Sequence, residues 1–205
     1  MACFEITIFN PRIEFLDKLL TIISGCRENN QKYQKILYDT YRAYALKMVF
    51  RYIYNYEEAL EVTNDGFVKF FLSIEKFRCA NEIDIENLLK GWIKRIMINT
   101  SIDLLRKKML LPEIGGMPDY IWELKDKSAS GDQILIYKDL IKLVKKLPPA
   151  YRIVFNMYVI DGYTHIEIAD SLKIPVGTSK SNLLRAKALM QKYLNQKEEL
   201  TECRI

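Results

Sequence analysis

Residues 162–186 read GYTHIEIADSLKIPVGTSKSNLLRA, a pattern of two short helices joined by a tight turn. Thr164 followed three positions later by Glu167 is a capping-box pattern, which predicts a helix beginning at about His165. The single histidine is expected at the surface of this first turn. The predicted helix has an apolar side at helical spacing, formed by Ile166, Ile168, Ala169 and Leu172.

The second half of the stretch predicts a turn and a second helix. Pro175 lacks an N–H and cannot continue the first helix. Gly177 is expected to relax the turn, and Thr178 or Ser179 to cap the next helix. A polar and basic helix that follows a short one is typical of helix-turn-helix motifs, in which the second helix enters a DNA major groove. An ordinary helical hairpin in a protein core has the same local pattern, so the rest of the chain must decide.

The composition favours an all-α protein. Hydrophobic residues make up 49% of the 205 positions, while glycine and proline number only 8 and 6. Long segments mix Leu, Ile, Lys and Glu at helical spacing, and few segments alternate as strands do.

Charge is unevenly distributed along the chain. Residues 57–86 carry eight acidic and three basic side chains, a net −5. Residues 87–108 carry six basic and one acidic, a net +5, and residues 134–197 carry eleven basic and four acidic, a net +7. Two basic blocks separate from an acidic one predict polyanion binding at two places and a different partner at the acidic block. Each block taken singly is also compatible with a merely solvated helix.

Metal, cofactor and membrane roles are not expected. The four cysteines form no Cys-x-x-Cys pair, and one histidine supplies no ligand set, so we predict no metal and no cofactor. No stretch approaches the roughly 18 apolar residues of a membrane span, so membrane insertion is not expected. The first residues lack a basic cluster before an apolar run, unlike a signal peptide, and reduced thiols fit a cytoplasmic protein.

The helical pattern divides the chain into two units. Helices are expected at about residues 15–25, 30–54, 57–77 and 85–108, followed by a stretch rich in glycine, proline and serine that is typical of a linker. A second helical unit follows, with helices at about 133–146 and 150–159 before the helix-turn-helix. The predicted parts are an N-terminal extension 1–20, a helical domain 21–108, a flexible linker 109–132, a helix-turn-helix domain 133–197 and a tail 198–205.

Three segments together resemble the extracytoplasmic-function sigma factors of bacterial RNA polymerase. Residues 143–186 contain Leu-Pro-x-x-Tyr-Arg, a glycine before the turn helix, Glu-Ile-Ala and Gly-Thr-x-x-Ser, as that family does. Residues 91–108, GWIKRIMINTSIDLLRKK, are similar to its Trp-Ile-x-x-Ile-x-x-Asn-x-x-x-Asp-x-x-Arg helix. Residues 57–71, EEALEVTNDGFVKFF, resemble its acidic polymerase-binding helix, although Asn64 stands where glutamine is commoner. The resemblance covers about residues 22–194.

The resemblance implies that the first domain, similar to sigma region 2, reads and opens the minus-10 promoter element. The second domain, similar to region 4, would read the minus-35 element as duplex. For duplex reading we expect Thr178, Ser179, Lys180, Ser181, Asn182, Arg185 and Lys187, of which Lys187 is equally compatible with a solvated side chain. For the minus-10 element we expect Lys94, Arg95, Asn99, Arg106 and Lys107. Trp92 is interpreted as a core residue, and Asp103 as a helix salt link to Arg106 and Lys107.

The resemblance implies core RNA polymerase and promoter DNA as partners. Core polymerase would dock on Glu58, Glu61, Asn64 and Asp65. An anti-sigma factor is a further candidate partner. No catalytic residues are expected, because the chain has no Ser-His-acid set and no phosphate-cradling glycine loop. The alternative function is a helix-turn-helix regulator that never engages core polymerase, and a small helical hydrolase is a more distant one.

Overall fold

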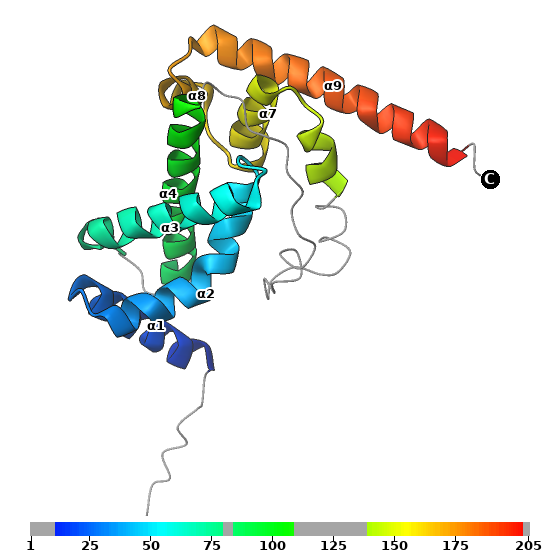
Figure 1. Ribbon diagram of the computed structural model, residues 1–205. Helices are drawn as coiled ribbons and strands as arrows, with labels where there is room; N and C mark the ends of the chain where they lie inside the picture. The colour runs from blue at the N-terminus through cyan, green and yellow to red at the C-terminus, as the bar shows by residue number, and fades with distance from the viewer. Residues whose placement is uncertain (1–10, 80–83, 109–138, 203–205) are drawn as a thin grey trace, which may run out of the picture.

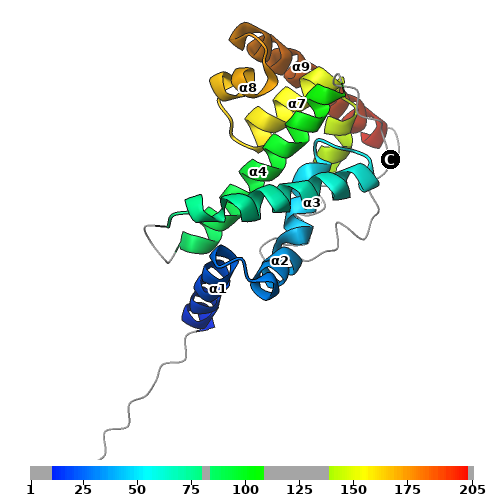
Figure 2. The same ribbon diagram turned by 60° about the vertical axis from the view of Figure 1, so that its left-hand side comes forward.

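The computed structural model describes residues 11–79, 84–108 and 139–202, and every regular element within these ranges is a helix. Figures 1 and 2 show the helices α1 to α4 in one group and α7 to α9 in another. The prediction of an all-α protein with two helical domains is confirmed. The predicted flexible linker 109–132 lies outside the described residues.

The first group begins with α1 (Pro11–Arg27) and α2 (Gln31–Phe50). Asn29 takes the left-handed conformation, with φ of 56°, and Asn30 caps α2 by accepting a hydrogen bond from the Lys32 N–H at 3.0 Å. Leu19 and Ile23 of α1 are buried in the core. The predicted boundary between residues 20 and 21 therefore falls inside a helix.

The helices α3 (Tyr56–Ser73) and α4 (Ile85–Lys107) complete this group, with the short 3₁₀ turn η1 (Ile74–Lys76) after α3. Asn55 caps α3 through the Glu58 N–H at 3.1 Å. Trp92 of α4 stacks on Phe77, with ring centroids 5.3 Å apart, and packs against Phe70 at 5.0 Å. Its interpretation as a core residue is therefore confirmed.

The second group begins with helical residues 139–145 and continues with α7 (Pro149–Phe155). The next residues widen into a π-helical turn, η3 (Asn156–Ile160). Gly162 then takes a φ of 79°, a backbone conformation that favours glycine, and turns the chain into the helix-turn-helix.

The helix-turn-helix consists of α8 (His165–Leu172) and α9 (Val176–Glu202). The capping box at Thr164 and the start at His165 are as predicted. The expectations for the turn were wrong in two respects. Lys173, with φ of 55°, takes the left-handed conformation, while Gly177 lies within α9. The helix α9 begins earlier than expected, since the Pro175 carbonyl accepts from Thr178 and Ser179, so neither of these two caps it.

The two groups pack against each other. Helix α4 runs from α1–α3 to α8 (Figure 1), with which it is in contact. The buried side chains of both groups form one continuous hydrophobic cluster. The basic face of α4 is thereby brought close to the helix-turn-helix.

Candidate nucleic-acid interface

The start of α8 is fixed by reciprocal hydrogen bonds. The Thr164 hydroxyl oxygen accepts from the Glu167 N–H at 3.2 Å, and the Glu167 carboxylate accepts from the Thr164 N–H at 2.9 Å. The Thr164 hydroxyl also donates to this carboxylate at 2.9 Å. Donation from the Thr164 N–H, and next from its hydroxyl, holds the pKa of Glu167 below its usual value, with a smaller contribution from the charge of Arg95. The carboxylate therefore stays ionised and anchors the first turn.

A polar contact ties α8 to α9. His165 Nδ1 lies 2.9 Å from the Ser179 hydroxyl oxygen, and the His165 ring stacks on Tyr158 with centroids 4.5 Å apart. His165 is thus partly buried between helices rather than a simple surface residue. These contacts fix the first turn of α9 relative to α8, which sets the angle at which α9 is presented.

The outer face of α9 carries most of the predicted duplex-reading residues. Lys180, Ser181, Arg185 and Lys187 are exposed, and Thr178 and Asn182 are partly exposed. The structure does not bring Ser179 to this face, because that side chain is fully buried against His165. The Lys187 ammonium lies 5.9 Å from the centroid of the Tyr158 ring. Leu184, 71% exposed, lies among these residues and was not singled out from sequence.

The basic residues of α4 divide between one stripe and its two flanks. Arg95, Asn99 and Arg106 are exposed and spaced four and seven residues apart, which places them on one face of the helix. Lys94 and Lys107 lie to either side of this stripe. Asp103 accepts from Arg106 at 2.5 Å, as predicted, and its second ion pair is with Lys69 of α3 at 3.4 Å rather than with Lys107.

Helix α3 carries an acidic stripe that continues into exposed apolar residues. Glu61 and Asp65 are exposed, and Val68 and Leu72, at the next helical positions of the same face, are 58% and 81% exposed. Asn64 is exposed beside them and accepts a hydrogen bond from the Tyr38 hydroxyl at 2.8 Å. Glu58 differs from the others, because it pairs with Lys108 at 2.5 Å and helps to join α3 to the end of α4.

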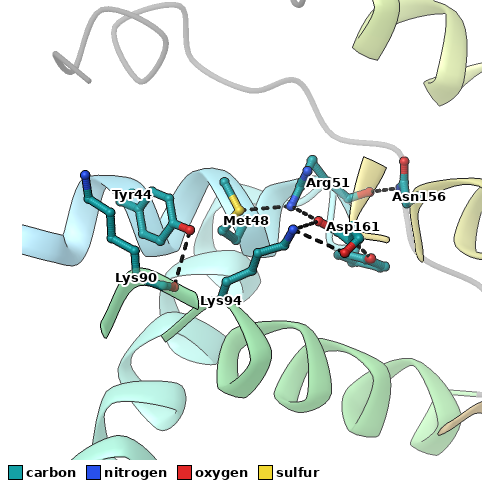
Figure 3. Close-up of polar contacts among 8 residues, drawn as sticks. Tyr44, Met48, Arg51, Lys90, Lys94, Asn156 and Asp161 are labelled. Carbon is teal, nitrogen blue, oxygen red and sulfur yellow. Dashed lines mark hydrogen bonds and ion pairs between the residues drawn. The ribbon is translucent and has the colours of Figure 1, made fainter. Parts of the chain in front are cut away.

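Asp161, in the loop before α8, joins the two groups of helices (Figure 3). Its side chain is 0% exposed, and its carboxylate accepts from Arg51 at 2.6 Å and from the Tyr52 hydroxyl at 2.5 Å. Lys94 of α4 lies 3.0 Å from the same carboxylate. Burial, and next the Asp161 charge, raise the pKa of the Tyr52 hydroxyl well above its usual value, so that it remains a donor.

A second set of contacts surrounds this ion pair. The Asn156 side-chain amide donates to the backbone carbonyl of Arg51 at 2.7 Å. The Arg152 guanidinium lies over the Tyr54 ring, 4.5 Å from its centroid, and the Lys145 ammonium lies 5.6 Å from it. Burial lowers the pKa of Arg152, whose side chain also donates to the Lys145 carbonyl at 3.0 Å.

Sequence reasoning missed this cluster. Residues 51–54, RYIY, follow α2 and are all buried, although the sequence suggested only the end of a helix there. Asp161 sits in the Asp-Gly pair before α8, where an acidic loop residue is unremarkable. A signal in the sequence was the run Arg-Tyr-Ile-Tyr itself, because its apolar residues are consecutive and do not follow the helical spacing of the apolar face of α2.

In the described part of the chain, no cluster of three potential metal ligands occurs. Within the same residues, no helix is both long enough and apolar enough to span a bilayer.

Comparison with known proteins gives a consistent result. The family model "Sigma-70 region 2" matches residues 37–110, and "Sigma-70, region 4" matches residues 137–190. The ECF RNA polymerase sigma factor SigW of Bacillus subtilis is 28% identical over 76% of this chain and 86% of its own length. The RNA polymerase sigma factor SigV of the same species is 29% identical, again over 76% of this chain and 86% of its own.

A solved structure of the sigma factor RpoE in complex with the anti-sigma factor NepR, from Bartonella quintana, is also similar. The two sequences are 16% identical, the match covers 89% of this chain and 97% of the RpoE chain, and the TM-score is 0.45. The two family models between them match most of both described helical groups, in the order expected from the sequence. The chain therefore belongs to the extracytoplasmic-function (ECF) family of RNA polymerase sigma factors.

Proposed function

We propose that this chain guides core RNA polymerase to promoters by two DNA-binding faces, on α9 and α4, and a polymerase-binding stripe on α3. The observation that carries the proposal is the separation of charge. Exposed cations lie on α4 and α9, whereas α3 presents exposed acids beside exposed apolar side chains. The basic surfaces of α4 and α9 attract the phosphates of nucleic acid, whereas the mixed acidic and apolar surface of α3 suits a protein partner. Because polymerase and promoter are both cytoplasmic in bacteria, we place the protein there.

The face of α9 is suited to duplex reading. Arg185 and Lys180 are exposed and able to reach guanine edges or phosphates, and Asn182 suits an adenine edge. Ser179 is left out of the reading set, because its burial keeps it from the groove. Its contact with His165 instead assigns it the role of holding α9 in place.

The stripe on α4 is suited to the opened minus-10 element. Arg95 and Arg106 offer charge to the phosphates of the separated strand, and Asn99 between them offers an amide to a base or phosphate. Trp92 takes no part, because its ring is packed among core aromatics.

The stripe on α3 combines Glu61 and Asp65 with Val68 and Leu72. Charge fixes the orientation of a partner, and the apolar pair supplies the buried area that charge alone lacks. We propose that core polymerase binds here. An anti-sigma factor, the class of partner seen with RpoE in its complex, is proposed as a second partner that competes for this chain.

Transcription in vitro with core polymerase and a promoter library tests the proposal. Promoter-dependent transcripts are expected with the wild-type chain. A chain that binds duplex DNA but not core polymerase would instead be a helix-turn-helix regulator, which is the alternative function.

Two substitutions separate the DNA-binding roles. Arg185→Ala is expected to weaken binding of the minus-35 duplex about tenfold or more, with Lys173→Ala as a control on an exposed lysine outside the reading face. Asn99→Ala is expected to slow strand opening without weakening duplex binding, with Asn87→Ala as the control in the first turn of α4. If Asn99→Ala and Asn87→Ala slowed strand opening equally, Asn99 would not be part of the DNA-binding site.

The α3 stripe is tested separately. Asp65→Lys should weaken core binding at least tenfold, because it reverses charge at the centre of the stripe. Glu75→Lys makes the same change at an exposed residue outside the stripe and should leave core binding unchanged. Unchanged binding in Asp65→Lys, measured by fluorescence anisotropy, would exclude this face as the docking surface.

A further inference from the structure

Asp161 is a fully buried carboxylate that belongs to one group of helices and finds its charge partners in the other. Arg51 and Tyr52, in the turn after α2, and Lys94 of α4 all donate to it within 3.0 Å. A carboxylate placed among an arginine, a lysine and a tyrosine hydroxyl occupies the kind of site that also binds a phosphate. The arrangement is therefore an anion site of region 2 that is filled by a residue of region 4.

The same contact reaches the basic face of α4, on which Arg95, Asn99 and Arg106 stay exposed. Lys94 is one of its cations, and Arg95 lines, with Glu167 and Tyr163, a cavity of about 300 Å³ between α4 and the loop that contains Asp161. Helix α8 faces this stripe with acids: the charge of Arg95 contributes to the lowered pKa of Glu167, after the Thr164 hydrogen bonds. The pKa of Asp170 is also lowered, chiefly by Lys173 and to a smaller extent by the charge of Arg106. Negative charge of region 4 thus lies beside the cations of α4 that are proposed to bind DNA.

Promoter binding requires this contact to break. The minus-10 and minus-35 elements are separated by roughly 25 base pairs, or about 85 Å of B-DNA. Lys94 belongs to the face of α4 that is proposed to bind the minus-10 element. Its ammonium lies 3.0 Å from the carboxylate of Asp161, in the loop that leads into the helix-turn-helix proposed to read the minus-35 element. The two groups of helices must therefore move apart on the promoter.

We propose that Asp161 stands in for a DNA phosphate: it holds the two regions closed in the free protein and yields Arg51 and Lys94 to promoter phosphates when the regions separate. This inference rests on the proposed function. It adds a self-inhibited state and assigns Arg51, which the sequence did not single out, to the DNA-binding surface.

The contact is suited to a reversible switch. A buried ion pair gains little over its separated and rehydrated partners, but it is strongly destabilised when one partner is removed in place. Asn156 adds one hydrogen bond to the Arg51 carbonyl, and Arg152 packs on Tyr54, at an interface that also buries apolar side chains of both groups. Polymerase and DNA together offer new partners to both surfaces and shift the equilibrium towards the open state.

Asp161→Asn in the full chain tests the proposal, with Asp39→Asn as the matched control. Asp39 is an exposed residue of α2 whose ion pair with Lys35 spans 3.9 Å, so its substitution removes the same charge without touching the interface. Small-angle X-ray scattering reports the separation of the regions. Anisotropy of a labelled random 20-nucleotide single-stranded DNA reports the uncovered cations, because phosphate contacts are independent of sequence.

Asp161→Asn is expected to increase the radius of gyration and to tighten binding of the oligonucleotide about tenfold. A tenfold gain corresponds to an open, binding-competent state whose population rises from about a tenth to most of the molecules. Arg51→Gln added to Asp161→Asn should remove part of that gain. Asp39→Asn should change neither the radius nor, beyond a small charge effect, the affinity.

Wild-type compactness and affinity in Asp161→Asn would overturn the proposal. Expansion with an affinity equal to that of Asp39→Asn would overturn the masking of a DNA site. Should Asp161→Asn fail to fold, Asn156→Leu, which removes the hydrogen bond to Arg51 at a buried position, must show the same expansion and gain. Wild-type transcription with core polymerase tests the proposed function separately, so the two can fail independently.

Discussion

At the scale of single residues, the helix-turn-helix depends on polar side chains that hold backbone groups rather than DNA. Thr164 and Glu167 satisfy the first N–H groups of α8, and Ser179 and His165 join the two helices. Such residues are easily taken for binding residues, because hydroxyls and imidazoles also contact DNA. Burial separates the two roles, as it does for Ser179.

Thr164→Ala is expected to lower the free energy of unfolding by about 1 kcal/mol, because the N-cap oxygen that accepts from Glu167 is lost. Thermal and urea unfolding of the full chain measure this change. Thr40→Ala, which removes the same atoms from the exposed middle of α2, should not destabilise the protein. Equal stability of both variants would show that the capping box contributes nothing.

The capping box also predicts a pH dependence. Since the folded-state pKa of Glu167 is depressed below 4.5, its stabilising contribution is present above pH 4.5 and is lost as the pH falls through that lowered pKa. The difference in Tm between wild type and Glu167→Gln should therefore be largest near neutral pH and shrink towards pH 3. Glu75→Gln, at an exposed position outside any capping box, is the control, and a pH-independent difference for Glu167→Gln would contradict the assignment.

At the scale of elements, α4 has one face packed in the core and another that carries the exposed residues proposed to bind DNA. Its buried residues Ile93 and Met97 alternate around the helix with the exposed Arg95 and Asn99. The close approach of α3 to α4 is permitted by Gly66. A Cβ added there would lie 2.4 Å from the sulfur of Met97, a side chain that is itself fully buried.

Two helix-interior glycines are therefore expected to respond in opposite ways to alanine. Gly66→Ala should destabilise the protein by about 1–3 kcal/mol, because the added Cβ forces the buried Met97 side chain to repack. Gly91→Ala should stabilise it by about 0.5–1 kcal/mol, since nothing lies within 4 Å of the added Cβ and the helix gains in propensity. Unfolding free energies of the two variants check the signs, and stabilisation by Gly66→Ala would show that α3 and α4 are less tightly packed than described.

At the scale of the whole molecule, sequence patterns predict what lies within a helix better than what lies between helices. The capping box at Thr164 and the core position of Trp92 were both predicted from residues a few positions apart. The Arg51–Asp161 pair joins residues 110 positions apart, and no periodicity relates them. The left-handed conformation of Lys173 was missed for a different reason. Glycine is the residue that most often relaxes a turn, so the turn was placed at Gly177 instead.

The complete holoenzyme is expected to bind promoters in a strongly salt-dependent manner. The logarithm of the affinity should fall linearly with the logarithm of salt concentration, with a slope of about −0.9 per phosphate contacted. Lys180→Gln on α9 should make the slope shallower by about one unit, whereas Lys35→Gln on α2 should not alter it. Binding titrations at four or more salt concentrations provide the slopes, and identical slopes for all three proteins would place Lys180 away from the phosphates.

The buried segment 51–54 has a consequence for recombination between relatives. It belongs to region 2, yet its side chains contact Asp161 and Arg152 of region 4, and its Arg51 carbonyl accepts a hydrogen bond from Asn156. A chimera that takes one region from another sigma factor would set Asp161 against a foreign turn, and a charge buried there without its arginine favours separation of the halves. Compatible halves must therefore be inherited, or transplanted, as a matched pair.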